Sequence, residues 1–223
     1  MPRTARIEVV NEPHHVYQRT IGDRAVFLKD KDYQVYLEFL KEKAAQYKID
    51  VLAYCLMKNH VHIVAIPRRK GALAKAIGRT HFAYTQYLNS KRTSNISIWR
   101  NRFQSCALGG DYLWKAVQYV ETLPVLDKKA RKADKYAWSS AAAHTSGKDP
   151  SGVLALKVWP SKAEKKKLTG LLTKKLTAEE IRILRTFTQT GRPLGPMPFI
   201  KALEKKFKRR LHPLPVGRPP KKD

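Results

Sequence analysis

The chain has 223 residues, 43% of them hydrophobic, which is enough for one full-sized core with length left for a small second module. Its 45 lysines and arginines against 18 acidic residues give a formal net charge of +27, which indicates a polyanionic partner, nucleic acid before a membrane surface. Two cysteines without a CxxC pair exclude a disulfide scaffold and a zinc finger. The lack of a secretory signal and of a run of roughly 20 apolar residues indicates a soluble, cytoplasmic protein.

The first half of the chain predicts the order strand, helix, strand, strand, helix, strand. Strands are expected at residues 14–21, 50–57, 60–66 and 98–108, and helices at residues 30–47 and 71–89. This order is that of the ferredoxin-like split βαβ arrangement, an α+β fold whose antiparallel sheet carries both helices on one face. The first and third strands are central neighbours in that topology, so the third strand is expected in mid-sheet.

A further helix is predicted at residues 111–125, with Pro124 at its end, and the composition changes soon afterwards. We expect a first domain at residues 1–145, followed by a basic connector at residues 146–175 that is rich in Gly, Ser, Pro and lysine. The first domain would therefore contain the whole sheet.

The C-terminal part predicts a small DNA-binding module. A capping box at residues 177–180 opens one helix, a proline-rich turn follows, and residues 199–211 form a strongly basic second helix, so residues 176–211 are interpreted as helix-turn-helix-like. The tail, residues 212–223, is expected to be disordered and basic, with its GRPP segment suited to a minor groove. The candidate DNA contacts are Arg192, Arg209, Arg210 and Arg218. Simple solvent exposure is the alternative for these arginines.

Two histidines stand at the start of the third strand, in MKNHVHIVAIP. His60 and His62 share one face of the strand, whereas Val61 and Ile63 point to the other face. Their imidazoles can therefore reach one divalent ion. Taken alone, the pair is better explained by two hydrogen-bonded polar residues at a strand entrance, because a His-apolar-His triplet often arises by chance.

Seven segments add information when they are taken together: HHVYQR, AYCLMKNHVH, FAYTQYLN, WRNRFQS, QYVETLPV, YAWSSAAAH, and GRPLG with a terminal GRP. In this order the chain resembles the HUH single-tyrosine transposases, and specifically the REP-associated tyrosine transposases of bacteria. The resemblance runs from about His14 to Ser140. It implies a single-stranded DNA endonuclease and strand transferase that acts on hairpin-forming palindromes through a 5′-phosphotyrosine intermediate.

The resemblance also implies the site. His60 and His62 would bind Mg²⁺ or Mn²⁺, which polarises the scissile phosphate, and Tyr119 would be the nucleophile. A phenol has a pKa near 10, so a nearby cation is needed to favour its ionised form. Spacing alone does not rank Tyr119 above the other tyrosines on helices, of which the rivals are Tyr84, Tyr87 and Tyr112.

One position departs from the family pattern. An amide or other polar side chain one helical turn after the tyrosine supplies the third metal ligand in the family, but here that position is Leu123. Glu121 could replace it if Pro124 kinks the helix. His14 or His15 could replace it from the first strand, or water and the DNA phosphate could complete the shell.

Competing functions stay open from the sequence. The first is a catalytically weakened or inactive, domesticated DNA-binding protein that recognises repeated palindromes, and the second is an RNA-binding protein. A two-histidine hydrolase of small molecules is disfavoured by the charge of +27. We expect a monomer or a homodimer, with the tyrosine acting in cis or in trans.

Overall fold

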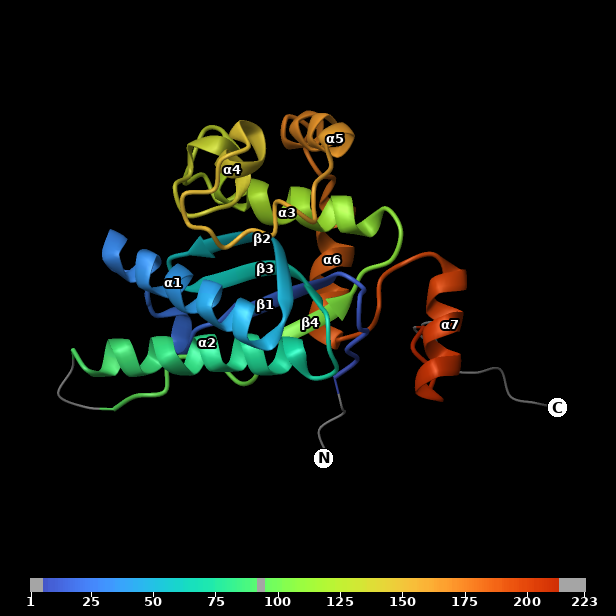
Figure 1. Cartoon of the computed structure of the whole chain (residues 1–223), viewed down its shortest axis with the longest axis horizontal. Helices are drawn as coiled ribbons and strands as arrows, with labels where there is room; N and C mark the ends of the chain where they lie inside the picture. Colours follow the sequence, from blue (N-terminus) through green and yellow to red (C-terminus); the bar gives the residue numbers. More distant parts are fainter. Residues whose placement is uncertain (1–5, 92–94, 213–223) are drawn as a thin grey trace.

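The computed structural model describes residues 6–91 and 95–212, which form a sheet covered by helices on both faces (Figure 1). Its strands are β1 His14–Arg19, β2 Ile49–Met57, β3 His60–Pro67 and β4 Gln104–Ala107. Its helices are α1 Asp30–Tyr47, α2 Ala72–Asn89, α3 Tyr112–Leu126, α4 Ala141–Ser146, α5 Lys162–Leu172, α6 Ala178–Thr190 and α7 Met197–Phe207. The strand order is β2-β3-β1-β4 with every neighbour antiparallel. The ferredoxin-like α+β prediction is therefore confirmed, with β1 and β3 in the centre.

Helices α1 and α2 pack together on one face of the sheet, as the sequence predicts. The alternate residues of β3 that point to this face, Val61 and Ile63, are fully buried in the core between sheet and helices. Tyr36 of α1 and Tyr84 of α2 fill the centre of that core with their rings 5.3 Å apart. Burying two whole aromatic side chains is worth several kcal/mol, so this face anchors the domain.

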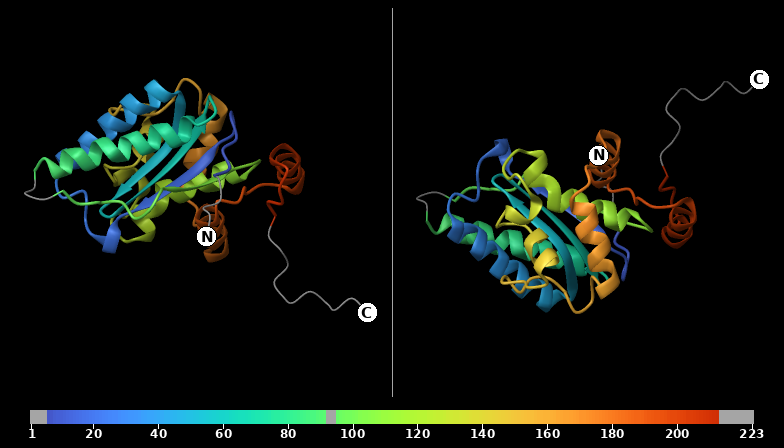
Figure 2. Two further views of the ribbon diagram at one scale, coloured as in Figure 1. Left: turned by 90° about the horizontal axis from the view of Figure 1, so that it is seen from below. Right: turned by 90° about the horizontal axis from the view of Figure 1, so that it is seen from above.

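The opposite face is covered by α3 and α6. The sequence predicted both helices but not their place on this face. Val64 of β3 and Cys106 of β4 point to this face and pack against Val117 of α3 and Leu184 of α6. Figure 2 shows the sheet enclosed between the two helical layers. Helix α3 lies over β2 and β3, whereas α6 lies over β1 and β4. The boundary between the two helices therefore runs above the central strands β3 and β1.

Two element boundaries differ from the sequence-based expectation. The strand expected at residues 98–108 is shorter, because Asn101 has a left-handed φ of 58° and only an isolated bridge joins Trp99 to Thr20 before β4 begins at Gln104. Helix α3 passes through Pro124 and ends at Leu126. Proline removes its own backbone donor, which weakens the last turn of the helix without ending it there.

The C-terminal helices do not form a helix-turn-helix pair, so that part of the prediction is wrong. Helix α6 buries Leu184 and Thr188 against the main sheet, while α7 packs separately, with Ile200 and Leu203 against Ile7 of the N-terminal segment. Figure 1 shows α7 at the side of the domain, away from α6. An amphipathic helix buries its apolar stripe on whichever surface accepts it, and for α6 that surface is the sheet. The division into domains at 145 and 175 stays a prediction.

The expected connector, residues 146–175, contains one helix, α5, at residues 162–172, and helix α4 at residues 141–146 ends where the connector begins. Helix α5 begins at a capping box between Ser161 and Glu164. Between the two helices Leu154 makes an isolated bridge with Val51, so this segment continues beside the sheet.

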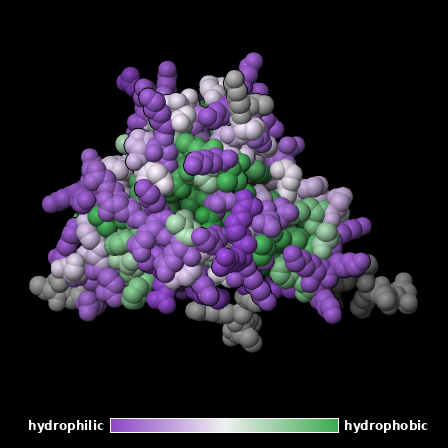
Figure 3. All heavy atoms as spheres, viewed as in Figure 1, coloured by the Kyte–Doolittle hydropathy of each residue, from purple (hydrophilic) through white to green (hydrophobic). Residues whose placement is uncertain are grey.

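Polar and charged side chains cover much of the face in Figure 3, as expected for a net charge of +27. No helix within residues 6–91 and 95–212 is long and apolar enough to cross a membrane.

Candidate active site

A cavity of about 370 Å³ lies on the α3/α6 face of the sheet. The strand register sets its floor, since His62 of β3 stands opposite Tyr17 of β1, and His60 stands opposite Arg19. The residues that line the cavity are His15, Tyr17, Arg19, Asn59, His60, His62, Tyr119, Leu123, Asp127, Arg185, Thr188 and Gln189. They come from β1, from β3 and the loop before it, and from α3 and α6 with the residue that follows α3. We call it the Tyr119 cavity.

The structure brings Tyr119 together with the two histidines. The ring centroids of His60 and His62 are 5.3 Å apart, and those of His62 and Tyr119 are 5.5 Å apart with nearly perpendicular planes. The pairing of β3 with β1 holds the histidines on the face under α3, and the helical position of Tyr119 points its ring at them. The Tyr119 hydroxyl and the imidazoles of His60 and His62 therefore share one cavity.

The rival tyrosines of the sequence lie elsewhere. Tyr84 and Tyr87 belong to α2 on the opposite face of the sheet, and Tyr112 at the start of α3 does not line the Tyr119 cavity. A tyrosine that the sequence did not single out does line it: the ring of Tyr17 lies 4.7 Å from that of His62. Tyr17 is thus the structural competitor for the role of nucleophile.

A chain of hydrogen bonds fixes the tautomer of His62. Thr188 Oγ1 donates its only proton to the Leu184 carbonyl at 2.7 Å, so it must accept from His15 Nδ1, which lies 2.7 Å away. Neutral His15 then has a bare Nε2, which accepts from His62 Nδ1 at 2.9 Å. His62 is left with its lone pair on Nε2. A hydrogen bond on the other ring nitrogen is how proteins orient an imidazole that binds a metal.

One hydrogen bond gives His60 the same tautomer as His62. Its Nδ1 lies 2.8 Å from Asn59 Oδ1, an acceptor, so Nδ1 carries the proton and Nε2 carries the lone pair. Burial lowers the pKa of His60 to about 4 and lowers that of His62 well below its ordinary value, because a charged imidazole is poorly solvated there. Both rings are therefore neutral near pH 7 and present a nitrogen donor.

Arg185 of α6 contacts the candidate nucleophile. Its Nε donates to the Tyr119 hydroxyl at 2.9 Å, and its guanidinium carbon lies 5.8 Å from the centre of the Tyr119 ring. Burial raises the pKa of Tyr119, and the hydrogen bond and positive charge of Arg185 act in the opposite direction. A cation thus stands where the negative charge of a phenolate would develop.

The position expected to supply a third metal ligand faces the cavity but offers no donor. Leu123 is 1% exposed, lines the Tyr119 cavity and lies one turn after Tyr119. One further turn along the same face of α3, Asp127 also lines the cavity, and its side chain has no ion-pair partner within the described residues. Within residues 6–91 and 95–212, no three His, Cys, Asp or Glu side chains lie together as a ready metal site.

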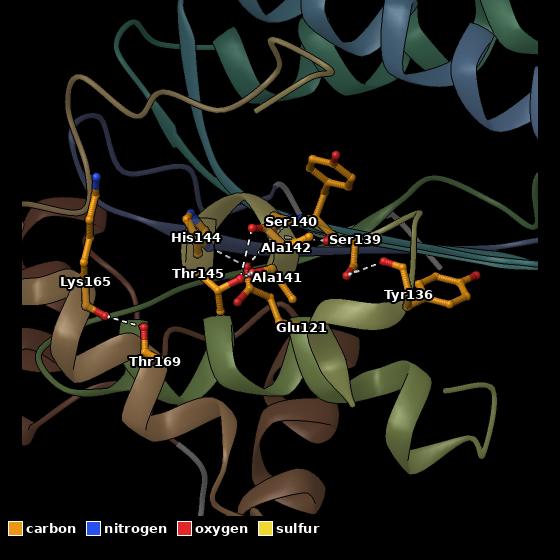
Figure 4. A network of polar contacts seen from close by, with 11 residues as sticks. Glu121, Tyr136, Ser139, Ser140, Ala141, Ala142, His144, Thr145, Lys165 and Thr169 are labelled. Atoms are coloured by element: carbon orange, nitrogen blue, oxygen red, sulfur yellow. Dashed lines mark hydrogen bonds and ion pairs between the residues drawn. The ribbon is translucent and has the colours of Figure 1, made fainter. Parts of the chain in front are cut away.

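The other substitutes for a third ligand are engaged elsewhere. Glu121 is fully buried and accepts from Ser140 Oγ and, at 2.5 Å, from His144 Nδ1, in the network between α3 and α4 shown in Figure 4. Both ring nitrogens of His14 are hydrogen-bonded to the backbone of the N-terminal segment, and both of His15 take part in the chain described above. Pro124 therefore does not bring Glu121 to the cavity.

The arginines predicted to contact DNA are spread over the C-terminal part. Arg192 lies half-buried between α6 and α7, outside the Tyr119 cavity. Arg209 and Arg210 follow α7 and line a shallow cavity with His212. Arg218 lies outside the described residues. The described arginines thus do not form one patch at the Tyr119 cavity, and the roles predicted for all of them stay predictions.

Sequence reasoning missed Arg185, Tyr17 and Asp127. The apolar stripe of α6 signals that the helix buries one face, but nothing in the local pattern says that this face meets the sheet beside Tyr119. Asp127 was detectable in principle, because it follows Tyr119 by eight residues and so returns to the same helix face.

Comparison with known proteins agrees with this geometry. Residues 12–122 match the family model of the IS200-like transposases. The chain belongs to the IS200-like transposase family. The matched range holds the whole sheet and the part of α3 with Tyr119, so the Tyr119 cavity lies mainly within it, whereas Arg185 lies outside. Membership makes the protein a DNA-binding transposase.

One solved structure shows the same fold. The chain is similar, with a TM-score of 0.57 and 15% identity over 73% of this chain and 93% of the other, to a REP-associated tyrosine transposase solved with a REP hairpin. A weaker match is to a protein from Deinococcus radiodurans R1 that is described as a transposase. Its TM-score is 0.38, with 16% identity over 54% of this chain and 97% of the other. No curated protein matches the chain.

Proposed function

We propose that this IS200-like transposase is a metal-dependent single-strand DNA endonuclease and strand transferase of the REP-associated type. The observation that carries the proposal is the Tyr119 cavity, in which one hydroxyl and two oriented imidazole nitrogens meet. A hairpin-forming palindrome is the proposed substrate, because the solved relative of the same fold is bound to a REP hairpin. The net charge of +27 suits a phosphate backbone.

The donor set fits a divalent ion at His60 and His62. Their Nε2 atoms carry lone pairs, their Nδ1 atoms are held by Asn59 and His15, and neither ring is protonated near neutral pH. When bound there, Mg²⁺ or Mn²⁺ would polarise a non-bridging oxygen of the scissile phosphate and orient it for in-line attack. Leu123 offers no donor at the position of the third metal ligand. We propose that the carboxylate of Asp127, which lines the same cavity, supplies this ligand.

Tyr119 is the proposed nucleophile. Its Oη forms a bond to phosphorus as the bond from phosphorus to the 3′ oxygen breaks, the phenol proton passes to solvent, and the departing oxygen takes up a proton as a 3′-hydroxyl. The 5′-phosphate stays on the tyrosine, so the energy of the bond is kept for joining. Arg185 stabilises the developing phenolate through the hydrogen bond to Oη. Tyr119 and the histidines line one cavity of one chain, which supports a tyrosine that acts in cis.

A covalent adduct tests the proposal. The protein is incubated with labelled single-stranded hairpin oligonucleotides and Mn²⁺, and the products are separated under denaturing conditions. A labelled adduct that Tyr119→Phe abolishes supports the enzyme. Leu123 at the position of a metal ligand favours the alternative, a DNA-binding protein with weakened or lost cleavage, and binding to hairpins without any adduct would establish that alternative.

A further inference from the structure

Two more cavities continue from the Tyr119 cavity across β1 and β4. The first, about 270 Å³, shares Tyr17, Arg19 and Gln189 with the Tyr119 cavity. The second, about 380 Å³, shares Arg102 and Gln189 with the first. Together they form a path along the edge of the sheet, which we call the arginine groove and define by Arg6, Arg19, Arg100, Arg102 and Arg209.

The backbone explains why arginines gather there. Asn101, with its left-handed φ of 58°, turns the chain between Arg100 and Arg102, and asparagine tolerates this conformation better than most residues. The Arg100 backbone N–H donates to the Arg19 carbonyl at 2.9 Å, which fixes the turn to β1. In consequence both arginine side chains line the same cavity beside Arg19.

The groove concentrates positive charge, although Arg19 forms an ion pair with Asp23 outside its two cavities. No acidic side chain lines either of its two cavities in the described part of the chain, and Arg100 and Arg102 are exposed and have no ion-pair partner there. Burial and the neighbouring charge of Arg102 lower the pKa of Arg6 to about 10. Like charges held close together cost free energy, and a bound anion would remove that cost.

Two buried polar atoms in the groove lack partners. Gln18, in the first cavity, donates its amide to the carbonyls of Arg19 and Arg100, but its Oε1 is unpaired. Ser105, in the second cavity, has an unpaired Oγ. Each residue is only 2% exposed. Buried polar groups are nearly always paired in folded proteins, so these two atoms mark places beneath the groove where ordered water or a small side-chain shift completes the hydrogen bonding.

We propose that the arginine groove binds the unpaired DNA strand that leads away from the phosphate in the Tyr119 cavity. The guanidinium groups would hold successive phosphates, and the polar side chains of Gln104 and Gln189 would face the bases. Cavities of about 270 and 380 Å³ lie at the small-ligand end of binding sites, so they suit single nucleotides and not a double helix. The inference rests on the proposed function.

The test measures binding of a labelled oligothymidylate of roughly 12 nucleotides at several salt concentrations, a length within the usual single-strand site sizes. The double variant Arg100→Gln/Arg102→Gln removes two exposed side chains that make no internal ion pair, so it should fold normally, which its melting curve checks. Each lost phosphate contact lowers the slope of log K against log salt by about 0.7, so the double variant should lose about 1.4. Arg79→Gln, an exposed arginine of α2 on the other face, is the matched control and should lose nothing.

A second comparison separates the groove from the rest of the protein. A hairpin with an unpaired tail should bind the double variant about 25-fold more weakly than wild type at about 0.1 M salt, while the same hairpin without the tail should bind both equally. If the double variant still cleaves and its salt slope and affinity are unchanged, the groove does not bind the strand, and the proposed function is unaffected. Equal losses on both hairpins would also overturn strand binding by the groove, since the arginines would then hold duplex. If wild type forms no adduct and binds no hairpin, the proposed function fails instead.

Discussion

Replacing Arg185 by glutamine should slow formation of the covalent adduct without abolishing it. The change removes the positive charge and replaces the charged Nε donor to the Tyr119 hydroxyl by an amide that offers only a neutral hydrogen bond. Burial already raises the pKa of Tyr119 and Arg185 opposes that effect, so the phenolate becomes harder to form without Arg185. The side chain that reacts stays in place.

The size of the effect follows from the contact. A hydrogen bond to a charged group contributes about 1.5–3 kcal/mol. Arg185 is exposed, so solvent screens its charge and the lower end of that range applies. A loss of about 1.5 kcal/mol corresponds to a rate about tenfold lower. Since the phenol must lose its proton and its pKa rises in the variant, the rate should recover as the pH increases.

The assay is the single-turnover rate of adduct formation with Mn²⁺ and a hairpin oligonucleotide, measured over a range of pH. Arg182→Gln is the control, because Arg182 lies on the same helix, is exposed and pairs with Glu179 outside the Tyr119 cavity. Arg185→Lys, which keeps the charge, should recover part of the rate. An Arg185→Gln rate within twofold of wild type, with the same pH profile, would refute the role of Arg185.

Three further predictions concern the metal, pH and packing. Asp127→Asn should weaken Mn²⁺ binding about tenfold in a titration without DNA. The control Asp111→Asn, at the far end of α3, should leave Mn²⁺ affinity unchanged, and equal affinities of Asp127→Asn and wild type would show that Asp127 is not a ligand. Burial lowers the pKa of His81 to about 3 from 6.5, so the unfolded chain protonates first and stability is lost as the pH falls below 6.5, by about 2 kcal/mol at pH 5. His81→Gln should reduce that loss in denaturant unfolding, and an identical acid dependence would contradict this assignment. Gly109→Ala should cost about 1–3 kcal/mol, because its Cβ would stand 2.5 Å from the Phe199 ring; an unchanged melting curve would show that α7 moves freely.

Local periodicity predicted most of the fold. The two-residue repeat of β3 placed His60 and His62 on one face and Val61 and Ile63 on the other, because side chains alternate along any strand. The order of strands and helices then fixed which strands are central. These features depend on short-range geometry and on a few topological rules, which a single sequence carries.

Long-range docking was not predictable in the same way. The hydrophobic stripe of α6 identifies a helix with a buried face, but the same stripe would fit a separate module or the sheet, and only the tertiary structure shows the sheet. The contact between Arg185 and Tyr119 spans 66 positions of sequence. Asn101 shortened the expected fourth strand for a related reason, since its left-handed conformation depends on the turn that Arg100 makes with β1.

The most direct test of the account is to find which residue carries the DNA. After reaction of the wild-type protein with a hairpin oligonucleotide and Mn²⁺, the adduct is digested and the nucleotide-linked peptide is sequenced by mass spectrometry. If Tyr119 is the nucleophile, the nucleotide is joined to Tyr119 by a phosphodiester, and the Tyr119→Phe variant forms no such adduct. Linkage to Tyr17, which lines the same cavity with its ring 4.7 Å from His62, would contradict this role of Tyr119.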